Sequence, residues 1–93
     1  MSIDRIIHSP ARLAIVSQLM VVEQADATWL RGQTGLSWGN LATHARKLEE
    51  AGYLSIEKEF VERKPRTMFA MTDLGKQAYA AYRRELLELL GED

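Results

Sequence analysis

Hydrophobic residues recur at helical spacing near the start of the chain. In residues 11–22 the apolar positions form two neighbouring lines with spacings of three and four residues. Such a broad stripe predicts a helix that is covered on more than one side. Ser9 and Pro10 mark its start, because serine caps helices and proline is preorganised for the first helical position.

Two further helices are predicted on either side of a tight turn. Asp26 can cap a short helix over residues 27–33, in which Trp29 and Leu30 face inward. Gly35 suits the left-handed turn position that ends it.

The next helix is predicted over residues 38–51, with Ser37 as its cap and Gly52 at its end. Helix, tight turn and second helix in close succession form a helix-turn-helix unit. The inward face of the second helix is expected to carry Leu41, Ala45 and Leu48.

The pattern changes to period two after this helix. Residues 53–60 alternate apolar and polar side chains and predict a strand, and residues 67–71 predict a shorter second strand. The polar stretch 61–66 between them contains a proline and is predicted as a loop.

A last helix is predicted from its cap, Thr72, into the leucine-rich end of the chain. Helices, a hairpin and a closing helix are the layout of a winged helix-turn-helix domain. This is an α+β fold, mostly α, with a helical core, a two-stranded β-hairpin wing and a C-terminal dimerisation helix. We expect one such domain over residues 1–93.

Composition narrows the classes of function. The chain of 93 residues has no cysteine and a formal net charge of -1. It therefore has no disulfide framework, thiolate metal site or cysteine nucleophile. The sequence has no membrane-spanning apolar run and no signal-peptide core at its N-terminus, so we expect a cytoplasmic protein. With two histidines outside any metal-ligand spacing and no catalytic motif, we expect no metal, no cofactor and no enzymatic activity.

The outward face of the helix over 38–51 is the candidate DNA-reading surface. The second helix of a helix-turn-helix lies in the major groove, where asparagine pairs with adenine and threonine contacts base edges. Lysine reaches guanine or phosphate, and a glycine lets backbone amides approach a phosphate. The alternative for each residue is a solvated helix face. The candidates are Gly39, Asn40, Thr43, His44 and Lys47.

A second candidate surface is the hairpin tip over residues 61–66. Arg63, Lys64 and Arg66 surround Pro65, which limits the conformations of the loop. Such a wing can lie along the DNA backbone or place an arginine in the minor groove. The alternative is a charged tip that prevents edge-to-edge aggregation.

The charge balance gives only weak support to a DNA-binding surface on the second helix and the hairpin tip. Residues 37–67 hold six basic and five acidic side chains, a balance of +1, and the remainder hold six and eight, a balance of -2. A basic surface therefore requires that the fold separate the charges.

Of the two tryptophans, Trp29 is expected to fill the core and Trp38 to pack rather than contact DNA.

Apolar residues at both ends of the chain exceed what one small core can bury. A two-fold dimer joining the termini would bury both sets and would place two recognition helices ~34 Å apart, matching successive major grooves. The alternative is a last helix that lies on its own domain with a frayed end. The expected dimer residues are Ile3, Ile6, Ile7, Tyr79, Tyr82, Leu86, Leu89 and Leu90.

Three segments in order resemble the MarR/ArsR-type winged-helix transcriptional regulators, in particular the small stand-alone winged-helix DNA-binding domains of prokaryotes. They are HSPARLAI, LxxHxxKLEEAGYL and KPRTMFAMTDLG, and the likeness covers about residues 3–83. The resemblance implies a dimeric DNA-binding regulator, often a repressor. It places Ser37, Asn40, Thr43, His44 and Lys47 on the recognition helix and Arg63, Lys64 and Arg66 on the wing.

Two differences from these regulators limit what the resemblance implies for this chain. The ligand sets of ArsR-type metal sensors are absent, and the chain has little room for the effector pocket that the longer MarR proteins hold. The effector is therefore unknown. We expect a homodimeric, sequence-specific regulator that binds double-stranded DNA. The alternative is a winged-helix protein-interaction module without DNA binding, which the slightly acidic total charge favours.

Overall fold

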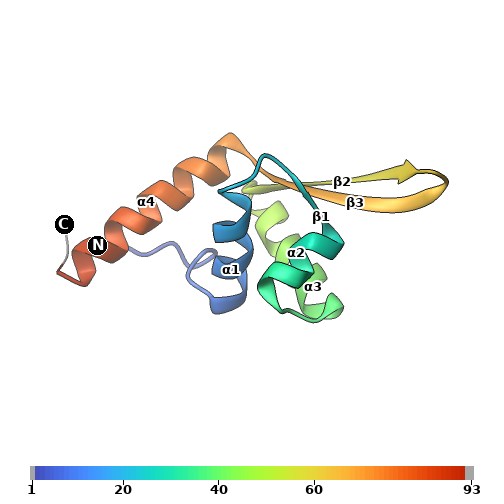
Figure 1. Ribbon diagram of the computed structural model, residues 1–93. Coiled ribbons are helices and arrows are strands. Elements are labelled where there is room, and N and C mark those ends of the chain that lie inside the picture. The colour runs from blue at the N-terminus through green and yellow to red at the C-terminus, as the bar shows by residue number, and fades with distance from the viewer. Residues whose placement is uncertain (1, 92–93) are drawn as a thin grey trace.

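A capping side chain begins each of the four helices in the computed structural model, which describes residues 2–91. Ser9, Asp26, Ser37 and Thr72 each accept a hydrogen bond from the backbone N–H three residues ahead, which satisfies a donor that a helix start leaves free. All four caps confirm the sequence prediction. The elements are α1 (Pro10–Leu19), β1 (Ala25–Asp26), α2 (Ala27–Thr34), α3 (Trp38–Glu50), β2 (Leu54–Val61), β3 (Lys64–Met71) and α4 (Asp73–Leu89) (Figure 1).

The helix-turn-helix forms as predicted. Gly35 joins α2 to α3 with a positive φ of 71°, a conformation that suits glycine. Along α3 the predicted inward residues are buried, and they are Leu41, Ala45 and Leu48. Helix α1 ends at Leu19, earlier than predicted, because the chain must turn there to reach β1, and this turn leaves Val21 exposed.

The wing is longer than the sequence indicated. Strand β2 continues to Val61 and β3 begins at Lys64, so the predicted loop over 61–66 is wrong except at Glu62 and Arg63. Pro65 lies within β3, opposite Phe60. A pair one step from a two-residue turn is a non-hydrogen-bonded pair, so the proline nitrogen points away from β2 and no ladder bond is lost.

A third strand was not predicted. Strand β1 has two residues, and it pairs with β3 at Phe69 and Met68 to give a three-stranded antiparallel sheet of order β1-β3-β2. This pairing attaches the base of the hairpin to the start of α2, because Asp26 is both the last residue of β1 and the cap of α2.

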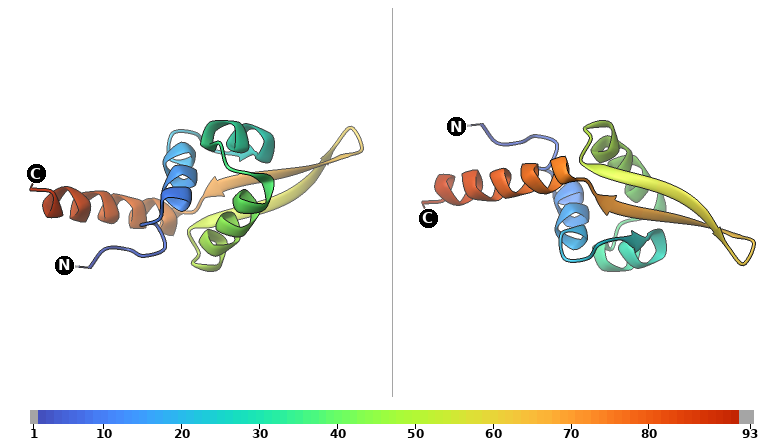
Figure 2. Two further views of the ribbon diagram at one scale, coloured as in Figure 1. Left: turned by 90° about the horizontal axis from the view of Figure 1, so that it is seen from below. Right: turned by 90° about the horizontal axis from the view of Figure 1, so that it is seen from above.

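The hairpin and α4 extend in opposite directions from the three-helix body (Figures 1 and 2). The principal extents, 51 × 24 × 21 Å, describe this elongated shape. The core lies between α1, α2, α3 and the base of the sheet. Trp29, predicted to fill it, is instead 37% exposed, and Leu30 beside it is the residue of α2 that is fully buried. The largest fully buried side chains are Ile7, Ile15, Val16, Leu19, Leu30 and Leu48.

A glycine sets the position of α4. Gly75 is buried, and a Cβ at this position would lie 2.1 Å from the carbonyl oxygen of Tyr53. Thr72 bonds to the same region, donating its backbone N–H to Tyr53 and its hydroxyl to the carbonyl of Gly52. The start of α4 is therefore fixed against the turn that follows α3.

Within residues 2–91 we find no helix with the length and apolar character needed to cross a bilayer.

Candidate nucleic-acid interface

The outer face of α3 presents most of the predicted DNA-reading residues. Because the opposite face is buried in the core, Asn40, Thr43 and Lys47 are exposed. Gly39 is exposed as well, and a Cβ there would meet no atom within 4 Å, so the backbone of the first turn is open to approach. The hydroxyl of Ser37 accepts the backbone N–H of Asn40 at 3.1 Å, which makes it the helix cap.

His44 occupies a different environment from its neighbours on this face. It is half-buried, and its Nδ1 lies 3.1 Å from Nη1 of Arg12 in α1. Burial, followed by the positive charges of Arg12 and Lys47, lowers the pKa of His44 below its ordinary value. One of its ring nitrogens is therefore already engaged within the chain, and the other is the nitrogen left for a DNA contact.

A groove of about 550 Å³ runs between α3 and the hairpin. Arg46 and Glu49 line it from α3, and Lys58 and Thr67 line it from the two strands. Arg46 and Lys58 were not among the predicted contacts. The alternation of β2 could have identified Lys58, since it shares a face with Leu54 and Ile56, both of which lie on the side of the core.

The acidic side chains of β2 lie on the face of the hairpin that turns away from α3. Residues opposite one another in an antiparallel pair share a face, and Lys58 and Thr67 are such a pair on the face toward α3. Glu57 and Glu59 alternate to the other face, where Glu59 lies opposite Arg66. The two acids of β2 thus lie away from the groove, on the face that also carries Lys64 and Arg66, whereas Glu49 of α3 lines the groove.

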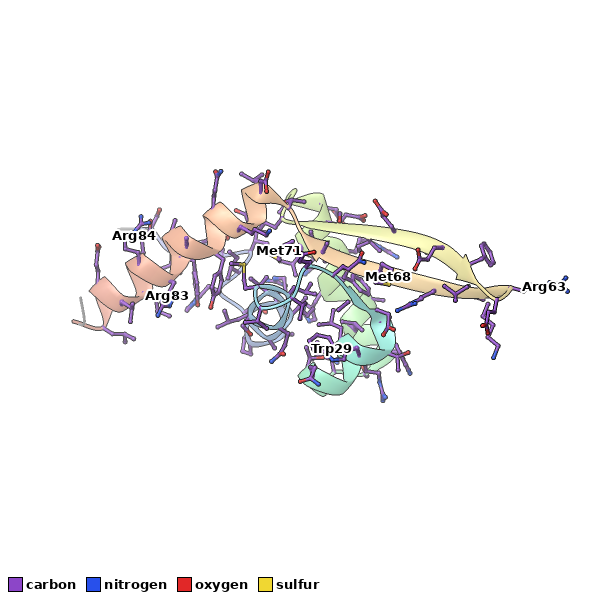
Figure 3. All side chains as sticks on the ribbon, turned by 45° about the horizontal axis from the view of Figure 1, so that its top comes forward. Trp29, Arg63, Met68, Met71, Arg83 and Arg84 are labelled. Carbon is purple, nitrogen blue, oxygen red and sulfur yellow. The ribbon has the colours of Figure 1, made fainter. Side chains whose placement is uncertain are left out.

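The predicted wing residues differ in their surroundings. Arg63 lies at the far end of the hairpin, where its side chain extends from the tip (Figure 3). Lys64 is exposed at the start of β3. Arg66, predicted as one of the cations of the tip, lies within β3 and is paired with Asp26, at 3.3 Å between Nη2 and Oδ2.

Two aromatic residues flank this surface. Phe60 is 77% exposed near the tip and shares its face with Lys58, so the groove-facing side of the wing also offers an apolar contact, which the sequence analysis missed. Trp38 is 52% exposed, and the guanidinium of Arg31 lies 5.0 Å from its ring centroid. The expectation that Trp38 is packed away is therefore only partly met.

No group of three or more His, Cys, Asp or Glu side chains that could hold a metal ion occurs within residues 2–91.

The apolar residues at the two ends of the chain divide into two sets. Ile7 and Tyr82 are 0% and 3% exposed within a single chain, so they are unavailable to a second copy and their prediction as interface residues is wrong. Tyr82 also bonds to Nδ1 of His8 at 2.9 Å. Ile6 and Tyr79 pack against the core of their own chain, and Ile3 and Leu86 are half-buried. The exposed members are Leu89 and Leu90, at 61% and 65%.

Comparison with known proteins agrees with this architecture. An uncharacterized protein of Methanocaldococcus jannaschii is 31% identical over 85 residues, covering 91% of this chain and 92% of that protein. The solved structure of a transcriptional regulator homologue from Pyrococcus horikoshii superposes with a TM-score of 0.88 at 28% identity, covering 95% of this chain and 87% of that one. A putative transcriptional regulator from Salmonella typhimurium superposes with a TM-score of 0.73 at 25% identity, covering 91% and 77%. Residues 11–90 match the family model for the winged helix DNA-binding domain, and the chain belongs to this family of winged-helix DNA-binding proteins.

Proposed function

We propose that the protein is a sequence-specific DNA-binding transcriptional regulator that places α3 in the major groove. The observation that carries this proposal is the orientation of α3, whose buried face turns Asn40, Thr43 and Lys47 outward together. These residue types bond adenine, contact thymine or a base edge, and bind guanine or phosphate. The likeness to the P. horikoshii transcriptional regulator homologue supports a role in transcription.

The groove between α3 and the hairpin is proposed to receive a sugar–phosphate strand. When a recognition helix lies in the major groove and a wing reaches the minor groove, the strand that separates the grooves passes between them. Arg46 and Lys58 would then bind phosphates from the two sides of the groove. Phe60 and Arg63 continue this surface toward the tip, with an apolar contact and a cation for the minor groove.

We assign the exposed end of α4 to a second copy of the chain. Leu89 and Leu90 are exposed there, with Leu86 and Ile3 half-buried. Apolar surface in water is unfavourable by about 25 cal/mol per Å², and a two-fold contact between identical ends would cover both copies at once. A dimer also supplies two copies of α3, as two half-sites about 34 Å apart require.

Repression is the mode of regulation that we propose, since a dimer bound across a promoter excludes other proteins from the same DNA without a catalytic step. This function involves no enzymatic activity and implies a cytoplasmic protein.

The test combines selection of DNA from a random pool with a mass measurement by light scattering. We expect enrichment of a two-fold symmetric sequence by a dimer. The matched variant is Leu89→Glu, which should reduce the mass to that of a monomer and weaken binding to the symmetric site while leaving the fold intact. The absence of binding at low salt with micromolar protein would contradict the proposal. It would instead favour the protein-interaction module, with which the net charge of -1 agrees.

A further inference from the structure

Arg12, in the first turn of α1, joins three separate parts of the chain. Its Nε donates to the carbonyl of Ile6, its Nη2 donates to the carbonyl of Arg5 at 3.4 Å, and its Nη1 lies 3.1 Å from Nδ1 of His44 on α3. The side chain is half-buried. Among residues 2–91 its partners are uncharged acceptors rather than carboxylates.

The chemistry of this contact determines where the ring proton of His44 lies. A guanidinium carries only donors and stays protonated, so Nδ1 of His44 must accept the bond from Arg12. An imidazole that accepts at Nδ1 carries its proton on Nε2. Protonation of Nδ1 would set two donors against each other and break the contact, and the lowered pKa of His44 agrees with a neutral ring.

The other ring nitrogen stays accessible on the outer face of α3. Each buried side-chain nitrogen or oxygen in the described part of the chain has a hydrogen-bond partner. The structure gives Nε2 of His44 no such partner within residues 2–91, so Nε2 keeps contact with solvent. His44 lies four residues after Asn40 and three before Lys47, which places all three on one side of the helix.

We propose that Arg12 is a positioning residue for DNA recognition: it holds His44 as a neutral imidazole whose Nε2–H donates a hydrogen bond to an acceptor of the bound DNA. This inference rests on the proposed function of α3. The acceptor is a base-edge atom in the major groove, namely a purine N7, guanine O6 or thymine O4, or it is a phosphate oxygen, and all of these accept the same N–H donor. The N-terminal segment, held by the same guanidinium, is thereby coupled to the helix that reads the DNA.

The first test needs no DNA. Long-range ¹H–¹⁵N spectra of the full chain report which ring nitrogen of His44 carries the proton, and we expect the neutral Nε2–H tautomer. Arg12→Met should give a mixture of tautomers and a higher pKa for His44. The control is Arg5→Met, which removes an equal charge but keeps the backbone carbonyl that Arg12 binds, and it should leave the tautomer unchanged. A proton on Nδ1 in the wild-type spectrum would overturn the proposal even if Arg12→Met failed to fold.

The second test is a double-mutant cycle on a selected duplex. Arg12→Met and His44→Leu should each weaken binding by about tenfold, the size of one lost recognition bond, and the double variant should be no weaker than His44→Leu alone. His44→Gln, which keeps an N–H donor, should retain most of the affinity. If the variants lose their preference at one base pair of the site, the acceptor is a base edge; if they lose affinity equally for all sequences, the acceptor is a phosphate.

Different results would contradict the positioning of His44 by Arg12 and the DNA-binding function of the protein. Additive losses in the cycle would overturn the coupling between Arg12 and His44. Absence of any DNA binding by the wild-type protein would overturn the proposed function together with the DNA contact of His44. The tautomer measured in the free protein would still decide whether Arg12 fixes the ring.

Discussion

Asp26 and Arg66 are joined by an ion pair of 3.3 Å that connects the start of α2 to the wing. The same carboxylate accepts the backbone N–H of Trp29 at 2.8 Å and so caps α2. One side chain therefore performs two separable tasks, because a cap requires an oxygen and an ion pair requires a negative charge.

Substitution of Asp26 should separate these tasks. Asp26→Asn keeps a capping oxygen and loses an exposed ion pair, so the free energy of unfolding should fall by less than about 1 kcal/mol. Asp26→Ala also loses the cap and should cost about 1 kcal/mol more, a shift of about 4–8 °C in Tm for a domain of this size. Thermal unfolding followed by circular dichroism measures both. Equal losses would show that the ion pair, not the cap, carries the contribution of Asp26.

Two glycines in helices should respond to alanine in opposite directions. Gly75→Ala places a methyl group 2.1 Å from the carbonyl oxygen of Tyr53, so the backbone must move and we expect a loss of about 2 kcal/mol or more. Gly32→Ala, in α2, meets no atom within 4 Å and should gain about 0.5–1 kcal/mol from helix propensity. Urea unfolding of the pair tests this, and a neutral Gly75→Ala would mean that α4 is not fixed where described.

Substitutions at the wing tip should change the stability of the fold and its affinity for DNA independently of each other. Glu62 and Arg63 have positive φ values of 51° and 67°, a conformation that is unfavourable by about 1 kcal/mol for residues other than glycine and asparagine. Arg63→Gly and Glu62→Asn should therefore both stabilise the fold. Arg63→Gly should weaken binding to all duplexes and lower the salt slope by about one, whereas Glu62→Asn removes a negative charge and should strengthen binding. Anisotropy titrations at several salt concentrations, alongside unfolding curves, measure both quantities.

Lys58 is expected to bind phosphate, although it lies in a strand. Lys58→Ala should weaken binding to all sequences and reduce the salt slope by about one, since it faces the groove beside α3. The matched control is Lys76→Ala, which removes the same charge from an exposed position on α4. If both variants lose affinity equally, the groove is not the path of the DNA strand.

The pair of Tyr53 and Asp4 predicts a pH dependence of stability at alkaline pH. Tyr53 donates its hydroxyl to Oδ2 of Asp4. That hydrogen bond, together with burial and the negative charge of Asp4, raises the pKa of Tyr53 to about 12. A raised pKa stabilises the folded protein fully below the unfolded value of about 10, and this contribution is lost as the pH rises through 12. The difference in unfolding free energy between wild type and Tyr53→Phe should therefore shrink between pH 10 and 12, and a constant difference would contradict this assignment.

Local signals were sufficient for the helix starts but not for the sheet or for the end of α1. The caps, the left-handed Gly35 and the inward face of α3 each depend on residues that are close together in the sequence. Strand β1 depends on distant residues, because its two residues become a strand only by pairing with Phe69 and Met68. Pro65 indicated a loop because its compatibility with a strand depends on the register of the hairpin, which places its nitrogen at the edge away from β2.

The same division applies to the site. Helical periodicity predicted correctly that Asn40 and Lys47 would be exposed. The contacts of His44 with Arg12 and of Arg66 with Asp26 were not predicted, because the partners lie 32 and 40 residues away in the sequence. The burial of Tyr82 likewise depends on how α4 packs against its own chain, which the width of an apolar band does not specify.

The pairing of β1 with β3 only at Phe69 and Met68 leaves the outer part of the hairpin as two strands alone. Insertion or deletion of residue pairs there would change its length without altering the body that holds α3. Each pair adds about 3.4 Å, and only an even number of pairs returns the tip residues to the same face. The distance between the bases read by α3 and the DNA reached by Arg63 is therefore adjustable in steps of about 7 Å, so evolution or design could retune the reach of the wing while the reading helix stays unchanged.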